Sequence, residues 1–457
     1  MRPQPRAIAI AVAVALVTGA CFGGGGSSAP RSSAGFSSVK IPQPSVSRLK
    51  KLTRRRLAPD SQRVDLGLPT FSNPTAVTNP LFPISDIHSS ILRGRVEGDP
   101  LKVEITLLPE TKTVTWNGIR IRALQSQFLA FLNGRINEVA IDLYAQADDG
   151  SVWYLGEDVF DYKGGDVVDV TESWRAGVDG PPALIMPAHP RVGDVYRTEN
   201  IPGVVFEEVT VKAVDQTVTG PSGPVHGAMV GQELHMEGDL EDKVFAPGYG
   251  EFHSGGGPDV EANALTVPAD RLQDPTPAEL KSLYSGALDI SDAARSRDWS
   301  AASRALHKLT ALWDAFQVAD VPRLLDTEMH DALAALTRAV TARDHRETPS
   351  AALAVAQASL DLELRYRPPL EVDLARFALW TRQLETDART GRRDAVVGDV
   401  ATLEWIRDRF PPQGPEARSI DDQLRFLEGA AQAGELTVAA DAAARLRGSL
   451  SQAKAER

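Results

Sequence analysis

The sequence predicts an α+β protein of two domains, an antiparallel β domain followed by an all-α domain of helical hairpins. From about residue 79 to residue 272, short alternating apolar patterns are separated by glycine-rich turns. From residue 276 to the end, apolar residues recur at helical spacing. Because the strands follow one another too closely for crossover helices, the sheet is expected to be antiparallel and to form a barrel, a half-barrel or a sandwich.

The first twenty residues have the composition of an export signal. Arg2 and Arg6 precede an apolar stretch at residues 7–17, and small residues then lead to Cys21, the only cysteine of the chain. The segment resembles a bacterial lipobox, and this resemblance implies cleavage before Cys21 and attachment of a diacylglycerol to its thiol. A secretory signal that is cleaved without lipidation is the alternative.

Residues 21–60 are predicted to be a flexible tether. The tether begins with a glycine run at residues 23–26 followed by serines, a composition typical of linkers. From Lys40 to Arg56 its charged residues are all basic, which would attract anionic lipid headgroups, although a solvated linker is the alternative. We therefore predict a cell-envelope protein that is anchored by lipid on the outer face of the cytoplasmic membrane, or in the outer membrane of a diderm host.

The composition excludes several classes of protein. A net charge of −12 argues against a nucleic-acid-binding protein, because such proteins normally present a basic face. The single cysteine excludes disulfide bridges within the chain, so buried cores must stabilise it. No later segment is apolar over the length that spans a bilayer, which leaves lipid as the expected anchor. We expect no cofactor, and the expected partners are the membrane and either an apolar small molecule or an envelope protein.

The strands of the β domain are separated by recognisable turn sequences. The clearest pair covers residues 139–147 and 151–157, joined by Asp148, Asp149 and Gly150, which suit a turn with positive φ. A second turn at residues 163–166 is expected to join two further strands, at residues 159–162 and 167–174. Similar alternation predicts strands at residues 103–108, 119–124, 204–214, 228–236 and 243–245.

The β domain also resembles a family of uncharacterised secreted or lipid-anchored bacterial β domains. The matching residues keep their order and spacing through the segments 142–158, 174–180, 185–196 and 244–248. The resemblance extends from Asn79 to His253, within the β domain that the strand pattern predicts at residues 61–272. The family has no established activity, so the resemblance implies no catalytic residue.

Residues 273–457 are predicted to form the helical bundle. Thr276 would cap the first helix and Glu279 would complete a capping box. Apolar stripes at helical spacing, interrupted by glycine or proline, then predict eight helices in all. The pattern is similar in a general way to helical domains of bacterial iron-uptake proteins, but His307, His330 and His345 lack the spacing of a metal site.

The boundary between the two regions is expected near residue 272. Pro268, Pro275 and Pro277 stiffen this part of the chain. We expect few contacts to cross between the regions, so that each would fold alone.

The aromatic hairpin supplies the candidate ligand-binding residues, Trp153, Tyr154 and Leu155. Trp153 and Leu155 share one face of their strand and Tyr154 points to the other, so one of the two sets should face the interior of the curled sheet. We predict a non-enzymatic protein that binds an apolar or lipid-like ligand in the β domain, or that docks a partner through its helices.

A carboxylate-based envelope hydrolase is the alternative. Its candidate residues are Asp142, Glu157 and Asp158, although Glu157 and Asp158 are adjacent in a strand and should point to opposite faces. A convergent cluster of carboxylates would favour the enzyme, and an uncharged apolar concavity would favour binding. The sequence assigns no residue a catalytic role.

One further group resembles a set of metal ligands. Glu233, His235 and Glu237 alternate along one predicted strand. A site of histidine and carboxylate ligands normally needs a ligand from a second element, so we interpret this row as a solvated strand face and assign no metal site.

Overall fold

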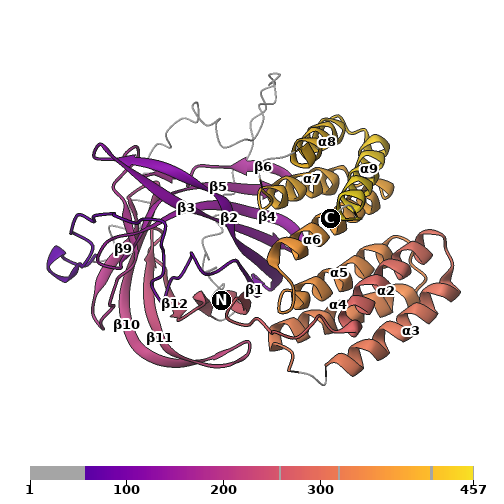
Figure 1. Ribbon diagram of the computed structural model, residues 1–457, viewed down its shortest axis with the longest axis horizontal. Helices are drawn as coiled ribbons and strands as arrows, with labels where there is room; N and C mark the ends of the chain where they lie inside the picture. The colour runs from indigo at the N-terminus through magenta and orange to yellow at the C-terminus, as the bar shows by residue number, and fades with distance from the viewer. Residues whose placement is uncertain (1–56, 257–258, 318–319, 412–414, 456–457) are drawn as a thin grey trace, which may run out of the picture.

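The computed structural model describes residues 57–256, 259–317, 320–411 and 415–455 (Figure 1). The predicted α+β class is confirmed, with antiparallel strands in the N-terminal part and helices in the C-terminal part. The predicted signal peptide, Cys21 and the tether as far as residue 56 lie outside the described residues.

The strands form one fourteen-stranded antiparallel sheet that does not close on itself. Within the sheet, adjacent strands are hydrogen-bonded in the order β6-β5-β4-β3-β2-β1-β14-β13-β12-β11-β10-β9. β7 and β8 also pair with β5. The strands are β1 (Ser89–Val96), β2 (Asp99–Trp116), β3 (Ile119–Leu132), β4 (Arg135–Gln146), β5 (Val152–Lys163), β6 (Asp166–Asp169), β7 (Trp174–Arg175), β8 (Ala183–Met186), β9 (Val195–Ile201), β10 (Val205–Gly220), β11 (Gly223–His235), β12 (Leu240–Ala246), β13 (Gly250–Gly256) and β14 (Asp259–Val267).

The sheet is strongly curled (Figure 1). Phe82, in the segment before β1, lies with its ring centroid 5.0 Å from that of Tyr144 on β4 and 6.2 Å from that of Phe245 on β12. Since β4 and β12 are far apart in the strand order, a flat sheet would not bring both to one ring. An apolar core that includes Val209 and Met229 therefore lies between the two halves of the curled sheet.

β5 is one strand where two were predicted, at residues 151–157 and 159–162. Gly156 has φ 126°, a conformation that glycine adopts without strain. A Cβ atom at this position would lie 2.4 Å from the carbonyl oxygen of Trp174 on β7. Glycine therefore lets β5 continue to Lys163 while β7 pairs closely beside it.

The described residues of the C-terminal region form the eight predicted helices. Helix α2 begins at Ala278 with Pro277 at its N-cap and without a side-chain cap, so the capping role predicted for Thr276 is wrong. The helices are α2 (Ala278–Arg295), α3 (Trp299–Phe316), α4 (Arg323–Thr341), α5 (Glu347–Glu363), α6 (Pro369–Arg389), α7 (Arg393–Arg407), α8 (Pro415–Gln432) and α9 (Leu436–Ala455).

The helices pack against one face of the sheet through buried ion pairs. Glu104 on β2 lies 2.8 Å from the guanidinium of Arg409 and 3.5 Å from that of Arg376. Lys102, also on β2, lies 2.5 Å from Asp361 on α5, which in turn lies 2.6 Å from Arg376 on α6. The expectation that few contacts cross between the two regions is therefore wrong, because charges from both regions neutralise one another in the interface.

Apolar packing also joins the sheet to the helices. Phe131 on β3 stacks on Trp380 of α6 with ring centroids 5.4 Å apart. Ile91 on β1 and Leu265 on β14 belong to the same core as Trp313 on α3. The last strand ends at Val267 and the first helix begins at Ala278, on either side of the expected boundary, yet the two regions share their cores.

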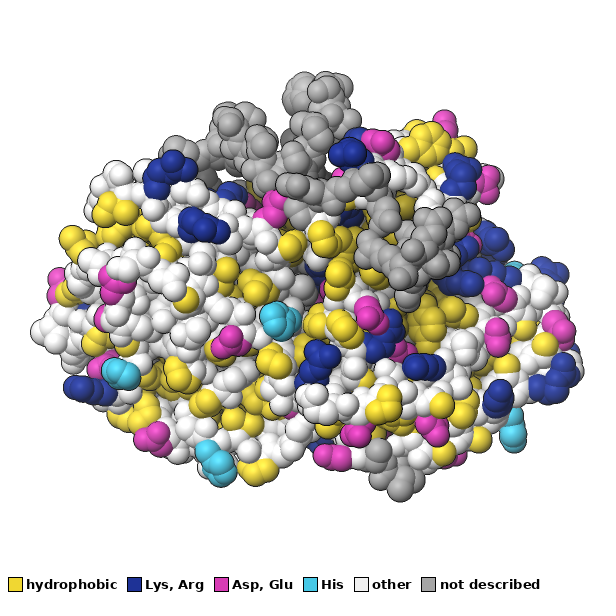
Figure 2. Space-filling model, viewed as in Figure 1, with side chains coloured by type: hydrophobic (Ala, Val, Ile, Leu, Met, Phe, Trp, Pro, Cys, Tyr) yellow, Lys and Arg dark blue, Asp and Glu magenta, His cyan; other side chains and the backbone are white. Residues whose placement is uncertain are grey.

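The outer surface of the helical region carries charges of both signs. Figure 2 shows acidic and basic side chains interspersed over this part of the molecule, as on an ordinary solvent-facing surface. None of the described helices combines the length and the apolar composition that crossing a membrane would require.

Candidate functional site on the inner face of the sheet

The face of the sheet that points away from the helices is called the inner face. Lys102 and Glu104 contact the helices, so Val103, which lies between them on β2, points to the inner face. Residues paired across neighbouring strands share a face. The register therefore extends the inner face from Val103 to Ala130, Glu138 and Asp161 on β3, β4 and β5.

The same register extends to the other half of the sheet. Glu261 on β14 pairs with Ser254 on β13, which pairs with Lys243 on β12. The inner face continues to Glu233 on β11 and to Glu199 on β9. The carboxylates on this face, here called the acidic cluster, are Glu138, Asp142, Glu157, Asp161, Glu199, Glu207, Glu233, Glu241, Glu251 and Glu261.

Curling brings these carboxylates close together from opposite halves of the sheet. Burial, followed by the charges of Glu207 and Glu157, raises the pKa of Glu199 well above its usual value, and Glu199 shares a hydrogen bond with Glu157 on β5. Burial and neighbouring negative charges, among them Glu261, also raise the pKa of Glu138 on β4 well above its usual value. The acidic cluster is therefore one electrostatic unit.

Tyr154 lies at the edge of the acidic cluster. Its hydroxyl donates a hydrogen bond of 2.6 Å to Asp142 Oδ1, and its ring stacks on Tyr144 with centroids 4.9 Å apart. Trp174 packs edge-on against Tyr154 and donates through Nε1 to Glu157 Oε1 at 3.1 Å. The predicted aromatic hairpin therefore contributes one of its rings to the inner face.

Asp142 and Glu157 keep their protons to a higher pH than carboxyl groups in water do. Burial raises the pKa of Asp142 to about 7, against the opposing effect of the hydroxyls of Tyr154 and Tyr144. Burial also raises the pKa of Glu157 to about 8, against the opposing hydrogen bond with Glu199. Each of these carboxyl groups therefore titrates near physiological pH.

The remaining predicted residues lie elsewhere. Leu155 is fully buried in the apolar core, and Trp153 is 6% exposed with its Nε1 donating to Ser151 Oγ at 2.9 Å. Asp158 points away from Glu157, as expected, and pairs with Arg175 at 2.5 Å and Lys112 at 2.9 Å. The structure thus brings Tyr154, Asp142 and Glu157 together and separates Asp158 from them.

Trp153 also lines a surface cleft of about 330 Å³. The cleft lies between the segment 64–69 and the loop that carries His189 and Arg191. Leu68 at its rim is 77% exposed. The cleft therefore combines an aromatic wall with a polar rim, and it is separate from the acidic cluster in the residues that line it.

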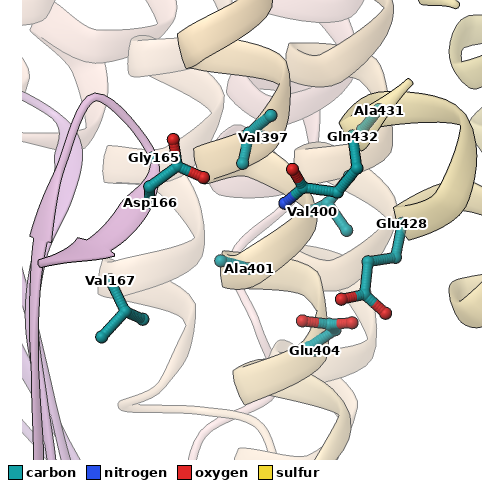
Figure 3. A pocket seen from close by; sticks show the side chains of 10 residues that line it. All are labelled: Gly165, Asp166, Val167, Val397, Val400, Ala401, Glu404, Glu428, Ala431 and Gln432. Atoms are coloured by element: carbon teal, nitrogen blue, oxygen red, sulfur yellow. The ribbon is translucent and has the colours of Figure 1, made fainter. Parts of the chain in front are cut away.

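A second depression lies between the β5–β6 turn and helices α7 and α8 (Figure 3). A Cβ atom on Gly165 would lie 2.4 Å from the backbone of Asp394 and of Gly398, so glycine permits the turn to pack closely on α7. The depression has a volume of about 30 Å³, enough for about one water molecule. It is therefore a packing gap and not a ligand site.

His235 lies within the acidic cluster, at the end of β11. Its Nδ1 lies 3.1 Å from Glu207 on β10, and its Nε2 lies 3.0 Å from Glu241 on β12 and 3.9 Å from Glu233. Lys243 Nζ lies 2.7 Å from Glu233 Oε2. His235 and Lys243 are thus the basic groups that reach this part of the described inner face.

The interpretation of Glu233 and His235 as a solvated row is wrong. Glu233 is 1% exposed and His235 is 6% exposed, because the curled sheet buries this face. The second element that seemed to be lacking is present, since β10 and β12 place Glu207 and Glu241 beside them. Glu237 lies beyond the end of the strand and does not belong to the row.

The charges of this group depend on one another. Burial acts to lower the pKa of His235, but hydrogen bonds to Glu207 and Glu241 raise it to about 11. Burial acts to raise the pKa of Glu207, but Lys243 and His235 together hold it well below its usual value. Burial and Glu207 raise the pKa of Glu233 to about 7, against the opposing effect of Lys243.

Sequence reasoning did not single out Glu199, Glu207, Glu241, Lys243 or Glu261. A signal existed in part, because Glu241 and Lys243 alternate along a short strand as Glu233 and His235 do. Pairing these two rows requires the hairpin register of β11 and β12, which the sequence alone does not provide.

No family model, curated protein or solved structure matches this chain. The resemblance to secreted bacterial β domains therefore stays a prediction.

Proposed function

We propose that this protein is a non-enzymatic envelope protein that binds a ligand with a positively charged group and an apolar part on the inner face of its sheet. The observation on which the proposal depends is the excess of carboxylates over His235 and Lys243 in the acidic cluster. Buried like charges raise one another's free energy, and a bound cation would lower it. The uncharged apolar ligand expected from the sequence would leave these carboxylates without a partner.

Apolar side chains next to the acidic cluster support the second half of the proposal. Ile105, Phe128 and Leu132 are half-buried and lie on the inner face of β2 and β3. They surround the buried Val103 in a small apolar cluster. A ligand lying along the sheet would contact these side chains with its apolar part while its cationic group met the carboxylates.

The location of the protein is part of the same proposal. The export signal and the Gly/Ser tether support a lipid anchor at Cys21, which would hold the β domain near a membrane. Amphiphilic ligands are concentrated at membranes, so an anchored binding protein would meet them there.

Matched ligands test this proposal directly. Decylammonium, decanol and decanoate share one alkyl chain and differ in charge, so calorimetric titration of each into the purified protein isolates the charge preference. An ammonium about 4 Å from one carboxylate gains about 4 kcal/mol at an effective dielectric constant near 20, and a decanoate would lose a similar amount. We therefore expect decylammonium to bind at least about 100-fold more tightly than decanoate. Equal binding of all three would refute the proposal.

Neighbouring carboxylates provide a matched pair of variants. Glu157→Gln removes an ionisable carboxyl group from the inner face, whereas Asp158→Asn removes one from the opposite face. We expect Glu157→Gln to weaken decylammonium binding and Asp158→Asn to leave it unchanged. The reverse order would contradict the assignment of the inner face as the binding site.

A carboxylate-based hydrolase is the second candidate, and the convergence of the carboxylates is the observation that favours it. Asp142 and Glu157 have pKa values raised to about 7 and about 8, as a general acid at neutral pH requires. Hydrolysis of nitrophenyl glycosides or esters that disappears in Glu157→Gln but persists in Asp158→Asn would support the enzyme in place of the binding protein.

A further inference from the structure

Three adjacent strands place metal-ligating atoms around one point of the inner face. The ligand atoms of Glu207, Glu233 and His235 all lie within 4.8 Å of one another. Glu241 on β12 is not one of these three residues but lies beside them, with its Oε2 3.0 Å from His235 Nε2. Donor atoms around a tetrahedral zinc ion lie about 3.3 Å apart, so the side chains of Glu233 and Glu241 would have to turn toward His235 Nε2 to share one ion with it.

An unpartnered oxygen provides independent support. The Glu241 side chain is only 2% exposed, and its Oε1 has no hydrogen-bond partner among the residues that the structure describes. Its other oxygen contacts His235 Nε2, which places Oε1 beside the imidazole. Buried carboxylate oxygens without partners are costly and rare, and a metal ion would satisfy this one.

The two sides of the histidine ring differ. On the Nε2 side, Glu241 lies 3.0 Å and Glu233 lies 3.9 Å from the ring nitrogen, and on the Nδ1 side Glu207 lies 3.1 Å from it. Histidine ligands commonly donate their second ring N–H to a carboxylate, which fixes the orientation of the ring. Glu207 is in the position to accept that hydrogen bond at 3.1 Å, and Thr198 Oγ1 donates to it from β9.

We infer that His235 Nε2, Glu233 and Glu241 are the ligands of a divalent transition-metal ion such as Zn²⁺, and that Glu207 is the positioning residue for His235. Imidazole and carboxylate ligands suit zinc, and three protein ligands leave a coordination position for water or for a ligand of the metal. Binding would displace the proton on His235 Nε2 to solvent and replace the contact of Glu233 with Lys243. This inference rests on the proposed preference of the inner face for cations.

Lys243 acts as an internal competitor for the metal ion. Its ammonium lies 2.7 Å from Glu233 Oε2 and 4.0 Å from Glu251 Oε1. When a metal ion binds Glu233, Lys243 can turn toward Glu251. Removing the ammonium without removing its volume, as in Lys243→Met, should therefore tighten metal binding by at least about tenfold, because one positive charge near the ion is lost.

Calorimetric titration of the full chain with Zn²⁺ alone, and the visible absorption spectrum of the Co²⁺ form, test the site. We expect one bound ion per chain and a Co²⁺ spectrum with imidazole coordination. Glu207→Gln should weaken binding about 10- to 100-fold, and His235→Gln should weaken it further. His226→Gln is the matched control, because His226 is exposed and lies on the same strand β11.

Several results would overturn the inference. One is the absence of Zn²⁺ binding to the wild-type chain, a measurement that does not depend on the folding of any variant. Another is equal binding by His235→Gln and His226→Gln, with circular dichroism showing both variants folded. The failure of the metal site is separable from that of the proposed function, because decylammonium binding without Zn²⁺ binding refutes the metal site alone. Zn²⁺ binding without decylammonium binding refutes the amphiphile alone.

Discussion

Replacement of Arg376 should destabilise the interface between the sheet and the helices more than any other substitution. Arg376 is fully buried and lies 2.6 Å from Asp361, 3.2 Å from Asp373 and 3.5 Å from Glu104. Lys102 and Arg409 contribute the other positive charges of this cluster. The buried positive and negative charges are therefore equal in number, and Arg376→Met would leave one carboxylate without compensation.

The expected cost follows from that imbalance. Methionine keeps most of the volume of the arginine stem, so the loss is mainly electrostatic. Removing one partner of a buried ion pair costs about 3 to 5 kcal/mol, because the remaining charge stays desolvated. With an unfolding entropy of about 2.1 cal/mol/K per residue over about 400 residues, this corresponds to a fall in Tm of roughly 4 to 6 °C.

Thermal and urea denaturation, followed by circular dichroism at the helical band, measure this loss. Arg382→Met is the matched control on the same helix α6, because Arg382 pairs with the half-exposed Asp292 at 3.0 Å. We expect the control to change the free energy of unfolding by less than about 0.5 kcal/mol. Adding Asp361→Asn to Arg376→Met restores the balance of charges and should recover part of the loss.

Equal stability of Arg376→Met and Arg382→Met would refute the reasoning, since it would mean that the buried charges do not depend on one another. A loss confined to the helical signal, with the sheet unchanged, would support separate folding of the two regions. Because Glu104 and Lys102 come from the sheet, we expect both signals to change together.

Three further predictions concern the pH dependence of stability, the aromatic hairpin and the lipid anchor. Burial raises the pKa of Glu157 to about 8 and of Asp142 to about 7, so the folded chain binds more protons than the unfolded chain between about pH 4.5 and pH 8. The free energy of unfolding should therefore fall as the pH rises from 5 to 8, and a higher Tm at pH 8 would contradict this. Trp153→Ala should lower the free energy of unfolding by about 3 to 5 kcal/mol, whereas Phe426→Ala, at a side chain 54% exposed, should have little effect in the same urea titration. Cys21→Ser should release the protein from membranes or leave a precursor of unprocessed mass, and finding it membrane-bound at the mature wild-type mass would refute the lipid anchor.

Much of the fold was predictable because its signals are local. Periodic apolar residues interrupted by glycine or proline identify the helices, and Asp148-Asp149-Gly150 identifies the turn between β4 and β5. The missing cap at Thr276 and the continuity of β5 were not predictable, because both depend on how neighbouring elements pack. At Gly156, the positive φ belongs to a close approach of β7 and not to the end of a strand.

The docking of the helices on the sheet was less accessible to sequence reasoning. Lys102 and Glu104 alternate with apolar Leu101, Val103 and Ile105, which is the usual pattern of a strand with one solvated face. In the structure both faces are covered, because the charged residues pair with charges of α5 and α6. Buried and exposed charged residues show the same alternation in the sequence. They can be distinguished only when the charged partner is known.

The acidic cluster, on the opposite face of the sheet, was not predicted for the same reason. Glu233 and His235 follow the alternation of a solvated strand, strand pairing places Glu207 and Glu199 beside them, and only the curl of the sheet brings Glu199 to Glu157 on β5. Polar residues at these positions cannot be satisfied by bulk water once the two halves of the sheet face each other. They must instead be protonated, paired with His235 or Lys243, or neutralised by something that binds. Burial, with smaller contributions from neighbouring carboxylates, raises the pKa values of Glu157 and Glu261 to about 8, so both groups lose their protons near and above neutral pH. The negative charge that they gain is the physical reason why a cation should bind there more tightly as the pH rises.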